Sequence, residues 1–128
     1  MIRARDRLGR PVSTNSPDAV PGINERSEID AATAWQEAIV YLERDLPFHA
    51  HETLELRWRC CPENERPLWK ALARWAAAIT HLARGNAKGA SSIARETILE
   101  LAQVDPAPLT RTDIDGVLAS LLLLNQAK

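Results

Sequence analysis

Apolar residues recur at steps of three and four along most of the chain after residue 27, which is the period of a helix with one buried face. Prolines, glycines and polar runs interrupt this pattern and divide it into five segments: 27–46, 47–61, 65–84, 86–104 and 110–124. No segment shows the alternation of apolar and polar residues that is typical of a strand. We therefore predict an all-α protein, a compact bundle of about five helices in which short connections make sequential helices antiparallel.

Residues with known preferences for helix ends set the predicted boundaries. Ser27 followed by Asp30 is a shortened form of the capping box, which places the first helix start near Ser27. Asp45 and Pro47 mark the break before the second helix, because proline suits a first helical turn. Gly85 should end the third helix, since glycine accepts the left-handed conformation. The last helix has two alternative caps, each a threonine with an aspartate three residues later: Thr110 with Asp113, or Thr112 with Asp115.

The first 27 residues differ from the rest because they lack a periodic apolar face and contain several prolines and glycines. The beginning of this segment is basic, with four arginines: Arg3, Arg5, Arg7 and Arg10. We predict a flexible N-terminal arm over residues 1–27, which could be removed with little loss of stability, and a single helical domain over residues 28–128.

Composition and charge argue against several classes of protein. The formal net charge is −1, so no broad basic surface for nucleic acid is expected. No apolar run approaches the roughly 18 residues of a membrane span, and the start of the chain lacks the apolar core of a signal peptide. Cys60 and Cys61 should be reduced thiols, because neighbours on a helix point about 100° apart. We expect a cytoplasmic protein with no nucleic-acid or membrane partner, and leave open a protein partner or self-association.

The stretch FHAHETLELRW, residues 48–58, concentrates histidine and glutamate on one predicted helix. His51 and Glu55 lie four residues apart and therefore share a helix face, at a spacing that metal-binding helices use. They fall among residues that should face the core. The third predicted helix carries a polar row that could meet them: Lys70, Arg74 and His81.

Three interpretations of these residues are open. In the first, the five side chains form a structural polar network in which Glu55 accepts hydrogen bonds from Arg74. In the second, His51, Glu55 and His81 bind a divalent metal such as zinc or manganese, and Glu52 acts as the general base of a hydrolase. The third is acid–base catalysis without a metal. A guanidinium beside a metal ion is unfavourable, so we favour the network, and with it a structural or interaction module.

Other candidate residues have simpler interpretations. Trp35, Trp58 and Trp75 lie on apolar faces and are predicted to be core residues. Trp69 lies off the main apolar stripe of its helix and should pack on the adjoining proline turn or mark an interface. His49 should be exposed, because it faces away from its neighbour His51. The sequence contains neither a glycine-rich phosphate loop nor a serine in a G-x-S-x-G context.

The combined motif resembles the bacterial and archaeal family called domain of unknown function 309. Its pattern is F-x-A-H-E-x-x-E-x-x-W, followed by H-L-x-R-G-N and a small GA pair. The matching positions are Phe48, Ala50, His51, Glu52, Glu55, Trp58, His81, Leu82, Arg84, Gly85, Asn86, Gly89 and Ala90. The resemblance covers residues 32–101 and implies a small all-helical fold and the label of a metal-dependent hydrolase. This chain departs from the family pattern at one position, because family members commonly carry glutamine where this chain has Arg74.

Overall fold

The structure, a computed structural model, describes residues 4–128, so the predicted basic residue Arg3 lies outside the described residues. Within this range the chain forms five α-helices and one short 3-10 helix: α1 (Ala31–Glu43), α2 (Pro47–Cys60), η1 (Glu63–Glu65), α3 (Arg66–Ala83), α4 (Ala87–Leu101) and α5 (Arg111–Asn125). No strand forms in residues 4–128; the arm makes only isolated bridges. The prediction of an all-α bundle is confirmed.

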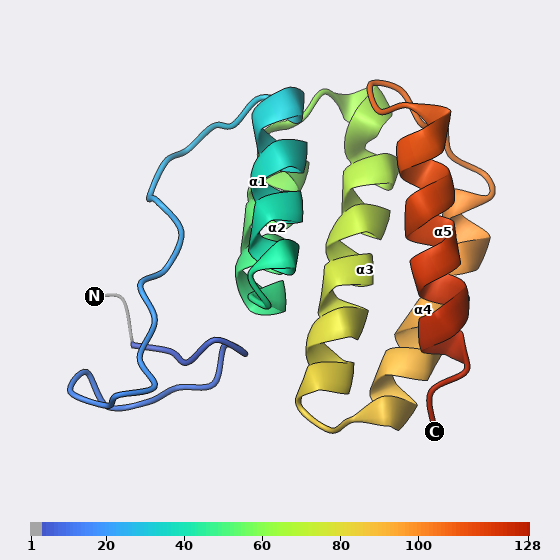
Figure 1. Cartoon of the computed structure of the whole chain (residues 1–128). Helices are drawn as coiled ribbons and strands as arrows, with labels where there is room; N and C mark the ends of the chain where they lie inside the picture. Colours follow the sequence, from blue (N-terminus) through green and yellow to red (C-terminus); the bar gives the residue numbers. More distant parts are fainter. Residues whose placement is uncertain (1–3) are drawn as a thin grey trace.

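Helix α3 occupies the middle of the bundle. The pair α1 and α2 lies on one side of it and the pair α4 and α5 on the other, with α3 packed against α2, α4 and α5 (Figure 1). Trp75 of α3 joins three helices. Its ring stacks on Trp35 of α1 with 6.1 Å between centroids, and its Nε1 donates to Ser120 Oγ of α5 at 2.9 Å. A centre of alanine, leucine and tryptophan therefore holds both helical pairs together.

Local residues at the helix ends account for the connections. Asp45 has a positive φ of 59° and Gly85 one of 86°, and α2 begins at Pro47, so these predicted breaks are confirmed. Thr110 forms the capping box of α5 with Asp113, which decides between the two alternatives. The predicted helix start at Ser27 was wrong: α1 begins at Ala31, because the Asp30 carboxylate accepts from Thr33 N and caps the helix there.

Trp69 contacts the turn between Pro62 and Pro67 through Glu65 of η1, which agrees with one of its two predicted alternatives. Its side chain is completely buried, and its Nε1 donates to Glu65 Oε1 at 2.9 Å. The Arg57 guanidinium lies 5.4 Å from the ring centroid. Because α3 is covered from several sides, residues beyond its main apolar stripe are buried as well.

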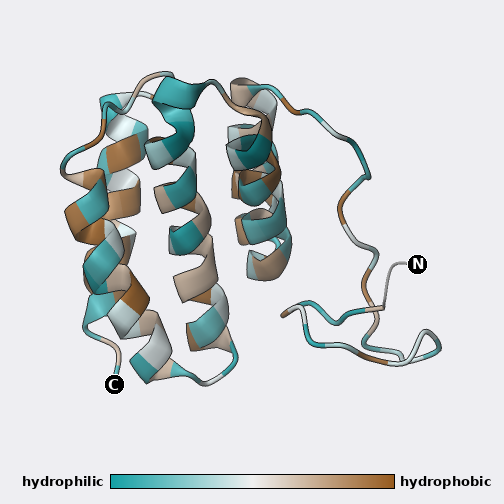
Figure 2. Ribbon diagram, turned by 180° about the vertical axis from the view of Figure 1, so that it is seen from behind, coloured by the Kyte–Doolittle hydropathy of each residue, from teal (hydrophilic) through white to brown (hydrophobic). Residues whose placement is uncertain are grey.

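The described part of the arm leaves α1, runs beside the bundle and then folds back on itself through turns, with bridges from Arg5 to Pro11 and to Val20 (Figure 1). Figure 2 shows it as mostly hydrophilic, with isolated hydrophobic positions. One of these, Leu8, is only 5% exposed. Arg7 pairs with Asp45 at 2.9 Å, and Arg26 pairs with Glu37 of α1. The mobility predicted for residues 1–27 stays a prediction, and so does the division of the chain at residue 28.

None of the helices in residues 4–128 combines the length and the apolar character that a membrane span requires.

Candidate functional site

The exposed edge of α2 carries the predicted histidine and glutamate pair. His51 Nε2 lies 3.5 Å from Glu55 Oε2, as expected for residues one helical turn apart. The other oxygen of Glu55 pairs with Arg59, which follows it by one more turn. About 30% of the Glu55 side chain is exposed, so this carboxylate is partly solvated as well as paired within α2.

The predicted pair between Arg74 and Glu55 was wrong. Arg74 Nη1 donates to Glu100 Oε1 at 2.8 Å, and its Nη2 pairs with Glu96, so the guanidinium joins α3 to α4. Two glutamates one turn apart on α4 match the forked donors of arginine. Lys70 was also predicted to belong to the polar network. Its side chain is exposed, and within the described residues it forms no ion pair with His51 or Glu55.

His81 lies in the capping arrangement of the next helix. Asn86 Nδ2 donates to His81 Nδ1 at 3.1 Å, while Asn86 Oδ1 accepts from Gly89 N at 2.9 Å and caps α4. Gly89 leaves room for this cap, since a Cβ atom there would lie 2.4 Å from Asn86 Nδ2. One ring nitrogen of His81 is therefore already used in joining α3 to α4.

The surroundings of His51 disfavour its positive charge. Burial is the largest cause and lowers the pKa of His51. Glu55 opposes this by raising the pKa, whereas Arg59, Arg84 and His81 lower it further. The neutral imidazole is therefore the stable form at pH 7.

The predicted metal ligands do not fit a metal ion. Among residues 4–128, no group of three or more His, Cys, Asp or Glu side chains is arranged to hold one. Glu55 is engaged by Arg59, and His81 by Asn86. The arginines that disfavour a protonated His51 would also repel a metal cation. We derive no metal-dependent step from these residues.

The arm covers the N-terminal end of α2, where the motif starts. Arg84 directly follows α3. Its Nε donates to the Leu8 backbone carbonyl at 2.8 Å, and its Nη2 donates to the same oxygen. Gly9 lies so close to Phe48 that a Cβ atom there would be 2.3 Å from the ring. The Arg5 guanidinium lies 5.4 Å from the centroid of the same ring. Two motif residues, Phe48 and Arg84, therefore contact the arm.

His49 is buried, and the prediction of an exposed side chain was wrong. Only 3% of the residue is accessible, because Tyr41 of α1 and the arm cover it, with 5.4 Å between the ring centroids of Tyr41 and His49. His49 Nε2 lies 2.8 Å from the Pro21 carbonyl oxygen. Since a carbonyl only accepts, Nε2 carries the proton. Nδ1 has no hydrogen-bond partner in the described part of the chain.

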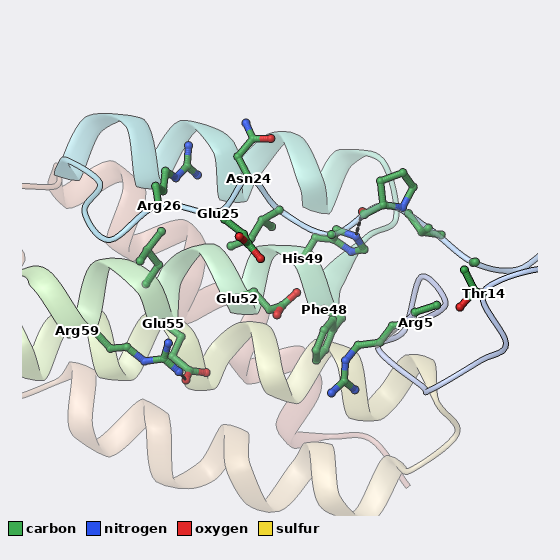
Figure 3. A pocket seen from close by; sticks show the side chains of 17 residues that line it. Arg5, Thr14, Asn24, Glu25, Arg26, Phe48, His49, Glu52, Glu55 and Arg59 are labelled. Atoms are coloured by element: carbon green, nitrogen blue, oxygen red, sulfur yellow. Dashed lines mark hydrogen bonds and ion pairs between the residues drawn. The ribbon is translucent and has the colours of Figure 1, made fainter. Parts of the chain in front are cut away.

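A pocket of about 610 Å³ lies between the arm and α2. Figure 3 shows the arm on one side of it and α2 on the other. Its walls carry apolar and ionisable side chains from both segments: Arg5, Val20, Ile23, Phe48, Glu52 and Leu56. Sequence reasoning missed this pocket because the arm has no periodic pattern; isolated apolar residues such as Leu8 and Val20 were the available signal.

Glu52, predicted to be a general base, lies in this pocket, whose lining includes neither His51 nor His81. Burial is the largest influence on its pKa and raises it. His49, Arg5 and Arg59 oppose that rise, and Glu55 adds to it. Glu52 makes no ion pair or hydrogen bond with any of residues 4–128.

Comparison with known proteins supports the resemblance seen in the motif. Residues 35–93 match the family model described as domain of unknown function (DUF309). This range includes most of α1, all of α2 and α3, and the beginning of α4. No curated protein and no solved structure matches the chain.

Proposed function

Because the chain carries a domain of the DUF309 family, a family of unknown function, we propose a role from its own geometry. The domain is an interaction module, and the edge formed by α2 and the end of α3 holds a peptide segment that is folded into a turn. In this chain, the arm occupies that edge. A partner protein with a similar segment would compete with the arm for the same contacts.

The observation that carries this proposal is the contact of Arg84 with the Leu8 carbonyl. Leu8 lies in a turn in which Gly9 N donates to Asp6 O at 3.0 Å, so Arg84 recognises the backbone of a turn and not one particular side chain. The Leu8 side chain is buried in the same place, and Gly9 packs closely on Phe48. Main-chain hydrogen bonds combined with one buried apolar side chain are typical of peptide recognition.

The test is to supply the arm in trans. A chain that lacks residues 1–22 should bind a fluorescently labelled peptide of residues 4–12, and fluorescence anisotropy would give a saturable curve. Arg84→Ala should weaken binding roughly tenfold or more, because a hydrogen bond to a charged group contributes about 1.5–3 kcal/mol.

Arg95→Ala is the matched control, since it removes the same charge from an exposed position on α4 and should leave binding unchanged. A peptide of scrambled sequence should not bind. Equal binding by the Arg84→Ala and wild-type versions of the shortened chain would refute the proposal.

The metal-dependent hydrolase has no geometric observation in its favour, but it predicts a different result. A metal that binds only the folded chain raises stability by about 2.7 kcal/mol at a hundredfold excess over its dissociation constant. We expect little change in melting temperature with zinc, manganese or nickel. A clear rise that is lost in His51→Ala would favour the hydrolase.

We also propose that the module works in the cytoplasm. Cys60 and Cys61 are both free thiols in the structure. Unbonded neighbouring thiols fit a reducing compartment.

A further inference from the structure

We propose that the pocket between the arm and α2 binds a small organic cation, a primary amine or guanidine attached to an apolar body. The pocket exists only while the arm lies against α2, so this inference rests on the docked arm of the proposed function. Its volume of about 610 Å³ is within the usual range for small-molecule sites, roughly 300–1,000 Å³.

Some carboxylates that line the pocket have no ion-pair partner in the described residues. Arg59 pairs with Glu55, and Arg26 pairs with Glu37 outside the pocket. The Arg5 guanidinium lies over Phe48 and donates to the Gly9 carbonyl at 2.6 Å. Two further carboxylates line the pocket without an ion pair in the described residues: Glu25, which is exposed, and Glu52, which is partly buried.

Glu52 is the carboxylate that would gain most from a cation. Burial raises the pKa of Glu52, which means that the surroundings disfavour its negative charge. An ammonium or guanidinium group beside it would restore the ionised form and form a charge-assisted hydrogen bond.

Glu52 can only accept hydrogen bonds in its ionised form, while an ammonium group only donates them. His49 also lines the pocket and lies three residues before Glu52, on the same side of α2. Its Nε2 donates to the Pro21 carbonyl, and its Nδ1 is buried, so His49 shapes the wall and Glu52 supplies the acceptor. The ionised Glu52 therefore matches an amine and mismatches a carboxylate ligand.

The remaining walls fit an apolar body. Val20 and Ile23 of the arm face the pocket together with Phe48 and Leu56 of α2. A ligand with one cationic end and one hydrophobic end would use both parts of this lining.

The test uses the full chain and three indole compounds of similar size: tryptamine, the neutral tryptophol and the anionic indole-3-propionate. Isothermal titration calorimetry should give a tryptamine dissociation constant on the order of 1 mM or lower, which is reasonable for a ligand of this size. Tryptophol and indole-3-propionate should bind at least tenfold more weakly. Equal binding of tryptophol, or tighter binding of indole-3-propionate at Arg5, would overturn the proposal.

Two variants with the same change of charge locate the site. Glu52→Gln should weaken tryptamine binding about tenfold, whereas Glu43→Gln, at an exposed position of α1, should leave it unchanged. Equal effects of both substitutions would overturn the assignment to Glu52. Amide chemical shifts in an NMR titration should change around Glu52 and Ile23 in the wild-type chain and should not change in the Glu52→Gln chain.

The pH dependence of tryptamine binding is an independent test of the same site. Tryptamine affinity should fall as the pH decreases through the raised pKa of Glu52, above the ordinary glutamate value of 4.5, because a neutral carboxyl attracts the cation less. Four neighbouring groups set this window: His49, Arg5, Glu55 and Arg59. Constant affinity from pH 7 to pH 4.5 would count against Glu52 as the partner.

Failure of this inference is distinguishable from failure of the proposed function. If the arm peptide binds in trans but tryptamine does not bind the full chain, only the cation site is refuted. If tryptamine binds in a Glu52-dependent manner while the peptide does not bind in trans, the cation site stands and the peptide module does not.

Discussion

At the scale of single residues, His51 illustrates how position decides chemistry. A histidine one helical turn from a glutamate would ordinarily gain a higher pKa from that neighbour. In this chain burial outweighs Glu55, and Arg59, Arg84 and His81 act in the same direction as burial. The side chain therefore serves the folded state as a neutral group, and protonating it costs stability.

This linkage predicts how stability changes with pH. The folded-state pKa of His51 is lower than its ordinary value of 6.5, so the unfolded chain binds the proton first as the pH falls. The contribution of neutral His51 is complete above pH 6.5 and is lost as the pH falls through the folded-state pKa, with a slope of at most about 1.4 kcal/mol per pH unit. His51→Gln should flatten the decline in melting temperature between pH 7 and pH 5. Parallel pH profiles for the two proteins would contradict this assignment.

At the scale of helices, the polar residues divide into separate contacts and do not form one central network. Arg74 joins α3 to α4 through Glu96 and Glu100, while Glu55 interacts along its own helix with Arg59 and His51. All of these side chains keep contact with solvent, so each ion pair should contribute modestly to stability.

Urea denaturation of a double-mutant cycle tests this division. Arg74→Gln should destabilise the protein by about 1 kcal/mol, and Glu55→Gln by less than about 1 kcal/mol, because partly exposed ion pairs contribute little. A buried Glu55–Arg74 pair, as in the network predicted from the sequence, would instead lose about 3–5 kcal/mol when one partner is removed. Arg74→Gln should couple measurably with Glu100→Gln and not with Glu55→Gln. If Arg74→Gln coupled more strongly with Glu55→Gln than with Glu100→Gln, the single polar network would be supported instead.

Helix ends and side-chain burial differ in how well they could be predicted from the sequence. Helix ends depend on local chemistry, so the roles of Asp45 and Gly85 could be inferred from neighbouring residues alone. Burial depends on what covers each face. One apolar stripe per helix predicts the core when one neighbour covers it, but α3 is covered from several sides and Trp69 is buried off its stripe. His49 is covered by an arm whose contacts follow no period, so no pattern could indicate its burial.

At the scale of the whole molecule, the arm extends the fold beyond the five helices. It contacts the bundle at several separated places, among them Glu37 of α1, Asp45 after α1, His49 in α2 and Arg84 after α3. Leu8 is buried, its neighbour Arg7 pairs with Asp45, and its own carbonyl accepts from Arg84. The proposed peptide-binding edge of α2 and α3 and the proposed cation pocket both require the arm to lie in this position.

Removing residues 1–22 tests whether the arm stabilises the bundle. Burial of the Leu8 side chain contributes about 1.5–3 kcal/mol, and the conformational entropy that the arm loses on docking is a cost that offsets part of this gain. Because polar contacts such as the Arg84 hydrogen bonds offset part of that cost, we expect a net loss of about 1 kcal/mol. For a domain near 100 residues this corresponds to a decrease in melting temperature of about 4–8 °C.

Circular dichroism should show that the shortened chain keeps its helices, because the core residues of α1 to α5 lie outside the deleted segment. Leu8→Ala in the full chain should reproduce part of the loss, and adding the peptide of residues 4–12 should restore part of it by mass action. An unchanged melting temperature after deletion would instead support the mobile arm predicted from composition. The arm would then be bound too weakly to compete with a partner segment, and the edge of α2 and α3 would be available to that partner.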